Sequence, residues 1–412
     1  MADVPSESGA PESDEQPGRL PTALVYDHAF LDHEVPDGFP ETAERIARAI
    51  GLIEYYLNEG ILPPEHVLRM ESRLATTDEL TTVHTRFYIE RVRRAVDRLM
   101  DGIGFYAPPR EFDSEVFLSP GSYTAALKSA GAALVALDAI GEHRARNGYA
   151  LVRPPGHHAR PDEAMGFCIF NNVAVAARYA QQRWGWKRVL IVDYDVHHGN
   201  GTEEVFYSDP DVVYFSIHQA YGRDGTPFYP GTGASTDTGA GAGLGATINV
   251  PLPPDSGWSV YDPIFRQVLW PVVDRMKPDV ILVSAGFDTH WRDPLAEMRL
   301  CNADFSDFTL ELTEMADRYC DGRLVVVQEG GYDLDVVSQA AATVLFALTG
   351  SDRIPDTVGE PPVLDFRWNE EAIIHAIYET HDLAGYRRKA RRPVVRPHWG
   401  EQEKKDVADP ER

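Results

Sequence analysis

Short apolar segments of the β type recur along this chain, and they constrain its fold more than any other feature. Several are continuous runs of Val, Ile and Leu rather than alternating patterns, which is typical of parallel strands covered on both faces. We expect strands at residues 22–26, 150–152, 188–192, 212–217, 247–250, 279–284 and 323–328. These segments therefore predict a sheet that is buried on both sides.

Longer amphipathic segments separate the expected strands. We expect helices at residues 41–58, 121–142, 171–183, 260–275, 305–319 and 334–348. The alternation of strands and helices predicts the α/β class, with one open, multi-stranded, mostly parallel central sheet flanked by helices. In open sheets of this kind, ligands bind at the carboxyl ends of the strands.

The two ends of the chain differ in composition from the part between them. Residues 1–20 are rich in Pro, Ser, Gly and acidic residues, so we expect a disordered acidic tail there. Residues 387–412 read as a charged C-terminal tail, with a docking strand or an oligomer contact as the alternative. We expect the intervening residues 21–386 to form a single folded domain.

Composition argues against several kinds of partner. The formal net charge of −25 disfavours direct binding of nucleic acid, which needs a basic surface, and weakly favours cationic substrates. No apolar run approaches the roughly 18 residues of a transmembrane helix, and no secretory signal is visible, so we expect no membrane partner. The three cysteines form no CxxC pair, so we expect reduced thiols in a cytoplasmic protein.

The residues that follow the expected strands are unusually polar. Because the carboxyl ends of parallel strands meet at one edge of a sheet, we expect these side chains to converge. This convergence of segments that are distant in sequence is the strongest indication of an enzyme. The segments are His157 and His158, Asp193 to His197, Ser216 to His218, Ser284 to Asp288, and Glu329 to Tyr332.

One of these segments has the pattern of a metal site. Asp195 and His197 are two residues apart, which puts them on one side of an extended backbone. Carboxylate and imidazole groups are ligands of the zinc type, and Asp288 offers a third ligand at the end of another strand. A single aspartate at a strand end is more often a helix cap, but three such residues indicate a metal with open positions for water and substrate. Ligand type does not separate zinc from ferrous iron.

Two further groups could take part in catalysis. His157 and His158 follow a Pro-Pro-Gly turn and would serve as a general acid and base, with Asp193 and Asn200 as the partners that fix their tautomers. Tyr332 follows two glycines and could donate a hydrogen bond to a carbonyl oxygen, although a packed tyrosine is the alternative.

Aromatic residues in the neighbouring loops suggest a binding channel. Gly166, Phe167 and Tyr229 could form narrow walls around an aliphatic stem. Taken singly, each aromatic residue is more often part of an ordinary core.

Together these motifs resemble those of the histone deacetylase superfamily, which includes acetylpolyamine amidohydrolases and acetoin-utilisation proteins. The resemblance covers roughly residues 22–380 and implies an arginase-like α/β fold, so that residues 21–386 would be a deacetylase domain. The matching segments are Arg-Pro-Pro-Gly-His-His-Ala (153–159), Gly-Phe-Cys (166–168), Asp-Tyr-Asp-Val-His-His-Gly-Asn-Gly-Thr (193–202), Pro-Gly-Thr-Gly (230–233), Ser-Ala-Gly-Phe-Asp (284–288), Asp-Pro-Leu (293–295) and Glu-Gly-Gly-Tyr (329–332).

The resemblance implies zinc-dependent hydrolysis of an N-acetyl amide. By this analogy Asp195, His197 and Asp288 bind one Zn²⁺ per chain, which activates a water molecule and polarises the acetyl carbonyl. His158, with Asn200 as its partner, would be the general base. His157, paired with Asp193, would give electrostatic or proton-shuttling support, and Tyr332 would stabilise the oxyanion.

The resemblance also implies two peripheral sites and an inner channel. An acyl-lysine tunnel would be lined by Gly166, Phe167, Tyr229 and Leu295, with Glu115 near its rim. A structural K⁺ or Na⁺ ion would be held by Asp193 and Ser216, together with the carbonyl oxygens of Asp195, His197 and Ile217. Arg45 is similar to a family arginine in an inner channel for acetate.

Some details resemble the class II branch and its bacterial relatives. Asn200 stands where class I enzymes have an aspartate, so His158 has a neutral partner. Leu295 stands where polyamine-selective relatives carry a glutamate, which modestly favours acyl-lysine. Phe39-Pro40-Glu41 departs from the usual His-Pro-Glu of the family.

The favoured interpretation is a zinc-dependent deacetylase that acts on acetylated lysine in proteins or peptides. The second is an amidohydrolase of acetylpolyamines or other small N-acyl amines. Two further alternatives are weaker. A non-catalytic acyl-lysine or metal-binding module is disfavoured because all the expected catalytic residues are present. An arginase-type dinuclear enzyme is disfavoured because it needs additional Asp and His ligands, and the sequence has only one Asp-x-His set. A homo-oligomer remains compatible with the sequence.

Overall fold

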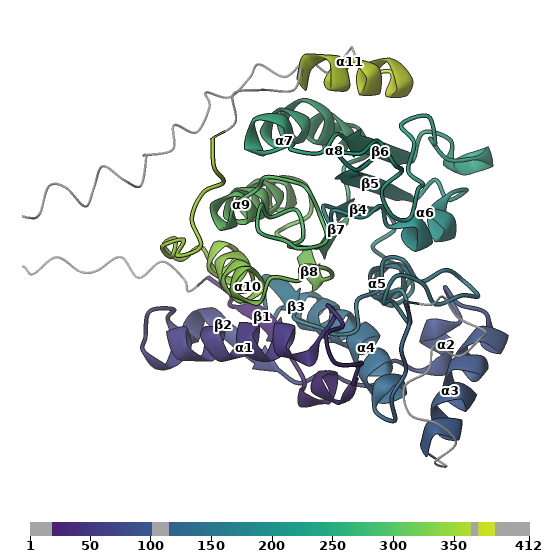
Figure 1. Cartoon of the computed structure of the whole chain (residues 1–412), viewed down its shortest axis with the longest axis vertical. Coiled ribbons are helices and arrows are strands. Elements are labelled where there is room, and N and C mark those ends of the chain that lie inside the picture. The colour runs from purple at the N-terminus through teal and green to yellow at the C-terminus, as the bar shows by residue number, and fades with distance from the viewer. Residues whose placement is uncertain (1–18, 101–114, 364–369, 384–412) are drawn as a thin grey trace, which may run out of the picture.

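The structure, a computed structural model, describes residues 19–100, 115–363 and 370–383. Its centre is an eight-stranded sheet in the order β2-β1-β3-β8-β7-β4-β5-β6, and every neighbouring pair is parallel. The predicted α/β fold with a parallel central sheet is therefore confirmed (Figure 1). The strands are β1 (Thr22–Val25), β2 (Val67–Met70), β3 (Asn147–Ala150), β4 (Val189–Asp193), β5 (Val212–Gln219), β6 (Thr247–Leu252), β7 (Val280–Ala285) and β8 (Leu324–Gln328).

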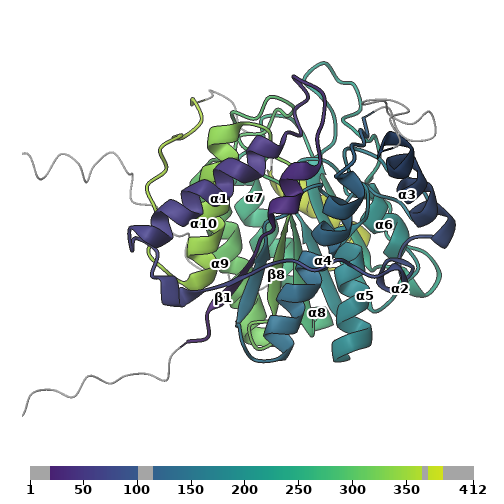
Figure 2. The same cartoon turned by 90° about the horizontal axis from the view of Figure 1, so that it is seen from below.

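Helices cover both faces of the sheet. The α-helices are α1 (Ala43–Asn58), α2 (Thr77–Leu80), α3 (Arg86–Met100), α4 (Ser122–Gly141), α5 (Asn172–Trp184), α6 (Asn200–Phe206), α7 (Trp258–Ile264), α8 (Trp270–Met276), α9 (Asn302–Tyr319), α10 (Leu334–Thr349) and α11 (Glu370–His381). Short 3₁₀ turns occur at His28–Asp32, Pro64–His66 and Gly241–Gly243. Helices α3, α4 and α5 pack on one face, and α1 and α7 to α11 on the other (Figures 1 and 2).

The central strands divide their side chains between two hydrophobic cores. In β4, Val189 and Ile191 face the core under α4 and α5, whereas Leu190 and Val192 face the opposite core. This is the period of two that an extended backbone imposes. Because both faces are buried, every position of β4 is apolar until Asp193, which explains the continuous Val, Ile and Leu runs.

Several predicted elements differ from the structure, and two of the differences have clear physical causes. Strand β2 was missed because it lies at the sheet edge, where it is partly exposed and only four residues long. Strand β3 ends at Ala150, before most of the predicted segment 150–152. The predicted helix 260–275 is interrupted by a π-helical turn at Phe265–Leu269, next to Pro271, whose missing N–H cannot serve an α-helical ladder. The prediction also lacked α2, α3, α6 and α11.

Helix α4 corrects the expectation that no segment could reach the length of a membrane span. Residues Ser122–Gly141 are long and apolar enough by length and composition, yet 72% of the relevant window is buried inside the fold. Helix α4 is apolar because it packs against strands β1, β3 and β8 inside the fold. Its many buried alanine, serine and glycine residues allow this close packing on several sides of the helix. Most of the predicted N-terminal tail (residues 1–18) and the whole predicted C-terminal tail (387–412) lie outside the described residues.

Candidate active site

The predicted polar segments meet in the middle of the sheet. Four of them follow β3, β8, β7 and β4, which are consecutive neighbours in the strand order, whereas the fifth, Ser216 to His218, lies within β5 next to β4. All four strands run in the same direction, so their carboxyl ends form one edge and the residues after them lie side by side.

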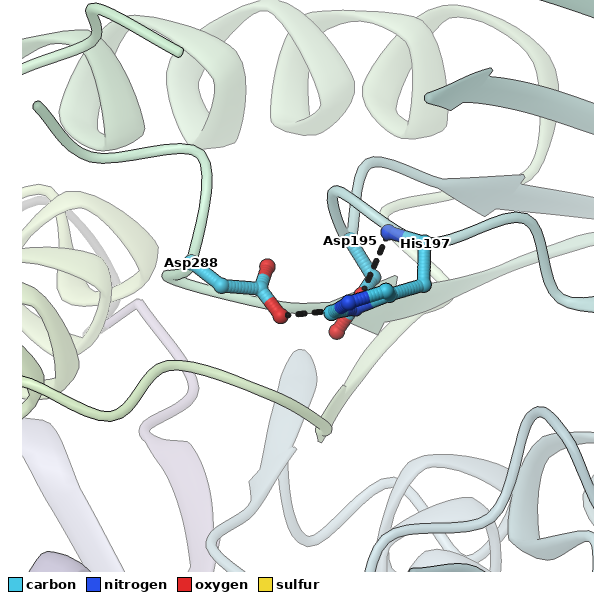
Figure 3. Close-up of side chains that lie close together, drawn as sticks. All are labelled: Asp195, His197 and Asp288. Carbon is cyan, nitrogen blue, oxygen red and sulfur yellow. Dashed lines mark hydrogen bonds and ion pairs between the residues drawn. The ribbon is translucent and has the colours of Figure 1, made fainter. Parts of the chain in front are cut away.

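The three predicted metal ligands form a compact cluster at this edge. One ligand atom from each of Asp195, His197 and Asp288 lies within 4.8 Å of the others. His197 Nδ1 is 3.1 Å from Asp195 Oδ1 and 3.3 Å from Asp288 Oδ2. The side chains point toward one another from the loops after β4 and β7 (Figure 3).

Two glycines make room for this cluster. A Cβ atom on Gly286 would lie 2.1 Å from Asp195 Oδ2, and one on Gly330 would lie 2.1 Å from Asp288 Oδ2. Any other residue at either position would therefore displace a carboxylate. Main-chain N–H groups fix the orientation, because Gly330 donates to Asp195 Oδ2 (2.8 Å) and Val196 donates to Asp288 Oδ1 (2.9 Å).

The cluster fits a divalent cation. Burial and the neighbouring Asp195 carboxylate raise the pKa of Asp288 to about 6. Asp288 Oδ2 is fully buried and accepts no hydrogen bond from the described residues. Two converging carboxylates and one imidazole are a donor set of the zinc type, and a bound cation would remove both the repulsion and the unsatisfied oxygen.

His157 is held by Asp193. His157 Nδ1–H donates to Asp193 Oδ2 over 3.0 Å, and Asp193 Oδ2 also accepts a hydrogen bond from the Tyr214 hydroxyl (3.0 Å). Burial alone would lower the pKa of His157, but the carboxylates of Asp193 and Asp195 outweigh burial and raise that pKa to about 10. His157 is therefore a cationic partner for the acidic groups around it.

His158 has the opposite character. Burial lowers the pKa of His158 well below its usual value, and the neighbouring charges of His157 and His197 lower it further. Its Nδ1 lies 2.8 Å from Asn200 Oδ1. The amide oxygen only accepts, so Nδ1 carries the proton and the lone pair of Nε2 is left for a substrate proton. The two imidazole rings are 4.1 Å apart, one neutral and one charged.

Tyr332 is anchored through its main chain. Its N–H donates to Asp293 Oδ2 (2.7 Å), while Asp293 Oδ1 accepts from the Leu295 N–H (2.9 Å). Gly331 before it has φ of 107°, a conformation that favours glycine. Burial raises the pKa of the Tyr332 phenol well above its usual value, so the hydroxyl keeps its proton and can donate.

Aromatic rings surround the catalytic groups. The Tyr229 ring lies edge-on to His158 at 5.2 Å, and Phe167 lies edge-on to Tyr332 at 5.7 Å. A Cβ on Gly166 would lie 2.4 Å from His158 Cδ2, so glycine lets this loop approach the imidazole. Phe167 has φ of 66°, a strained conformation for a residue with a side chain, of the kind that gathers at functional sites.

The remaining predicted residues are those for the rim of the acyl-lysine tunnel and for the monovalent cation. Leu295 is 37% exposed, and its N–H donates to the Asp293 carboxylate that also holds Tyr332. Glu115 is half-buried in a turn directly after residues 101–114, which the structure does not describe. Asp193 and Ser216 are in register on neighbouring strands, with Ile217 buried beside them. The roles of these residues in substrate or cation binding stay predictions.

Three supporting residues escaped the sequence reasoning. Buried Glu329 accepts from the main-chain N–H groups of Gly156 (2.6 Å) and His157 (3.2 Å), which fixes the turn before the two histidines. Asp293 links Leu295 to Tyr332 as described above. Phe228 stacks on His197 with ring centroids 5.2 Å apart and planes at 15°. Glu329 and Asp293 lie within the quoted motifs, but no sequence signal pointed to Phe228.

An open parallel sheet that gathers a histidine pair, carboxylates and a phenol at its carboxyl edge defines an α/β protein with the side chains of an enzyme active site. Residues 39–348 match the histone deacetylase domain, and the chain belongs to the histone deacetylase family. The predicted family is thus confirmed.

Named relatives agree with this assignment. The chain is 37% identical over 354 residues to histone deacetylase 14, chloroplastic, of Arabidopsis thaliana (83% of this chain, 80% of that protein). It is 33% identical to a probable deacetylase of Archaeoglobus fulgidus (88% and 96%) and 41% identical to a histone deacetylase-like amidohydrolase of Pseudomonas aeruginosa (67% and 69%). The crystal structure of the HDA15 HD domain superposes with a TM-score of 0.75 at 34% identity, covering 88% of this chain and 94% of that one.

Proposed function

We propose that this protein is a zinc-dependent deacetylase that hydrolyses the acyl amide of lysine side chains in proteins or peptides. One observation carries the proposal: a three-ligand cluster that fits a divalent cation lies beside two imidazoles, with His157 Nε2 3.8 Å from Asp195 Oδ1 and the His158 ring 5.8 Å from that of His197. Burial lowers the pKa of His158, and neighbouring carboxylates raise that of His157, so the two imidazoles suit different roles. Asp195, His197 and Asp288 would hold the zinc. When bound, zinc would polarise the acyl carbonyl and lower the pKa of water.

The residues of the chain supply the proton transfers. His158 Nε2 takes a proton from the attacking water and returns it to the amine when the C–N bond breaks. The charge of His157 favours the negative charge that develops on the acyl oxygen, and Asp193 holds this imidazole in place. The Tyr332 hydroxyl donates a hydrogen bond to the same oxygen. Phe167 and Tyr229 would enclose the aliphatic stem of lysine and exclude bulk water.

A second candidate is a small acetylated amine. The net charge of −25 favours a cationic substrate such as acetylputrescine. The apolar, partly exposed Leu295 provides no carboxylate to hold a second ammonium group, which favours acyl-lysine instead.

Kinetics of the zinc-reconstituted protein on an acetyl-lysine peptide and on acetylputrescine test both candidates. We expect faster turnover of the peptide, and a loss of about 10²–10³-fold in kcat for Tyr332→Phe, the size seen when one oxyanion donor is removed. Bound zinc should be unchanged in this variant. A large preference for acetylputrescine would move the proposal to small amines, and no turnover of either substrate despite bound zinc would overturn it.

A further inference from the structure

Helix α3 carries an exposed basic face that the proposed reaction does not use. Its apolar side chains Tyr88, Ile89, Val92 and Val96 are buried in the core that α3 shares with α4. The opposite side borders a surface cavity of about 490 Å³. The lining residues are Arg86, Phe87, Glu90, Arg91, Arg94 and Arg98. We call this the arginine face.

The arginine face is strongly positive on a chain with a net charge of −25. Its lining contains four guanidinium groups and one carboxylate, and one of the four, Arg86, pairs with Asp78 at 3.5 Å. Phe87, Arg91, Arg94 and Arg98 follow helical spacing, so they form one stripe. Among the described residues, Arg94 and Arg98 have no ion-pair partner, whereas Arg93 beside them pairs with Glu90 (2.8 Å) and Asp97 (3.1 Å).

An exposed aromatic ring lies at the start of this stripe. Phe87 is 76% exposed, more than Tyr55 and Tyr221, the other exposed aromatic side chains among the described residues. Arginine and aromatic residues together are enriched in protein–protein interfaces, where the ring supplies apolar contact and the guanidinium groups supply directed hydrogen bonds. This composition suits a peptide segment with carboxylate groups.

The arginine face is attached to the loop that carries active-site residues. Thr85 N–H donates to the Pro161 carbonyl (2.8 Å), and the Tyr88 hydroxyl donates to the Ile169 carbonyl (2.5 Å). The Arg91 guanidinium donates to the Asp162 carbonyl (2.6 Å). This loop runs from the two histidines to Gly166 and Phe167. Helix α3 lies outside the α4–α5 layer, at the periphery of the molecule (Figures 1 and 2).

We propose that the arginine face binds an acidic segment of the acylated protein substrate, at a distance from the acyl-lysine. The inference rests on the proposed function and names the substrate class: proteins with an acidic segment near the modified lysine. The planar guanidinium groups match carboxylates in paired hydrogen bonds. A short acidic segment meets mainly the local positive field, because charges beyond about 8 Å are screened at physiological salt. A long polyanion such as nucleic acid would meet the negative remainder of the surface.

Matched peptides test this inference. Two substrates share one acetyl-lysine and one Gly-Ser spacer, and they end in a run of either Glu or Gln. We expect the wild-type protein to turn over the Glu peptide with kcat/KM roughly five- to tenfold above that of the Gln peptide, as expected for two exposed charge pairs. The preference should disappear in 0.5 M salt, since exposed pairs are screened.

The double variant Arg94→Glu/Arg98→Glu should lose this preference and keep the wild-type kcat/KM on the Gln peptide. A control variant, Arg144→Glu/Arg183→Glu, changes the net charge by the same amount away from the arginine face, because Arg144 follows α4 and Arg183 lies in α5. This variant should retain the preference for the Glu peptide. An undiminished preference in the Arg94/Arg98 variant would overturn the inference.

Binding of a fluorescent Glu peptide without acetyl-lysine separates this inference from the proposed function. Binding that depends on Arg94 and Arg98 would support the arginine face even if neither substrate were hydrolysed. No binding above that of the Gln peptide would refute it, and tighter binding of single-stranded nucleic acid would replace it with a nucleic-acid surface.

Discussion

Two buried clusters of charged side chains lie in this fold and balance their charges in opposite ways. In the first, Arg45 and Arg153 both donate to Glu41 Oε1 (2.9 and 2.8 Å), and their other N–H groups donate to main-chain carbonyl oxygens. In the second, the Asp195 and Asp288 carboxylates face His197, and Asp288 Oδ2 accepts no hydrogen bond from the described residues. Glu41 Oε2 is likewise buried without a hydrogen-bond partner among the described residues, so an unsatisfied oxygen does not separate the two clusters. The difference is the excess charge: two guanidinium groups compensate one carboxylate in the first cluster, whereas two carboxylates share one imidazole in the second, which leaves negative charge for a cation.

The two clusters are also joined. Arg45 donates to the carbonyl oxygens of Gly331 (2.5 Å) and Glu329 (2.7 Å), and its guanidinium lies 4.9 Å from the centre of the Tyr332 ring. The compensated cluster thus holds the turn that presents the phenol to the uncompensated one. A rigid support beside an electrostatically open site is what preorganised catalysis requires.

The strongest test of the difference between the two clusters is the variant Asp288→Asn. We expect kcat/KM to fall by at least about 10³-fold, because a cation that supplies several kcal/mol of charge stabilisation would be lost. The variant should bind less zinc, measured by elemental analysis. The metal-free variant should be as stable as the metal-free wild type or more stable, because one of two facing carboxylates is gone. A marked fall in the free energy of unfolding of the metal-free variant would show that Asp288 stabilises the fold, as we expect for Glu41, and would contradict the comparison.

Glu41→Gln makes the opposite test in the compensated cluster. Removing one partner of a buried ion pair costs about 3–5 kcal/mol, because the remaining guanidinium groups lose their counter-charge. Urea denaturation should show this loss in the free energy of unfolding. Glu44→Gln on the same helix is the matched control: Glu44 also pairs with an arginine four residues on, but both side chains are about half exposed. We expect a change of about 1 kcal/mol or less there, and equal losses in both variants would contradict the comparison.

Much of this arrangement could be predicted from the sequence, because strands that are buried on both faces appear in it as continuous apolar runs. Strands β4, β7 and β8 are covered on both faces, so their apolar runs end where the buried functional residues begin. The short edge strand β2 shows no such run. Helix α3 does carry an amphipathic pattern, with Tyr88, Ile89, Val92 and Val96 on its buried side, but the prediction did not use it. Interactions between loops were harder still, since nothing in the spacing of Phe228 or Asp293 shows what those side chains contact across the fold.

We expect a smaller effect on kcat for Asp293→Asn. This variant tests whether Asp293 acts only by positioning Tyr332 and takes no part in the reaction itself. Asn keeps one acceptor oxygen but replaces the other by a donor, so one of the main-chain contacts to Leu295 and Tyr332 is lost. Misplacing the phenol should lower kcat by about 10- to 100-fold, with a small change in KM and in bound zinc. Asp293→Ala should be worse than Asp293→Asn. A KM effect without a kcat effect would mean that Asp293 serves substrate binding rather than the position of Tyr332.

The smallest expected effect comes from Asn200→Asp, which adds charge to the one imidazole that the site keeps neutral. A carboxylate 2.8 Å from His158 Nδ1 would favour the protonated imidazole and raise the pKa of His158. Since the general base must be neutral, activity rises with pH through this pKa, and the acidic limb of the kcat/KM profile should move to higher pH. Well above the pKa of His158 the loss should be only a few-fold, because His158 is then neutral in both wild type and variant. A profile that keeps its acidic limb in place would show that the limb reports another group, and that the neutral amide partner is not what keeps His158 a base.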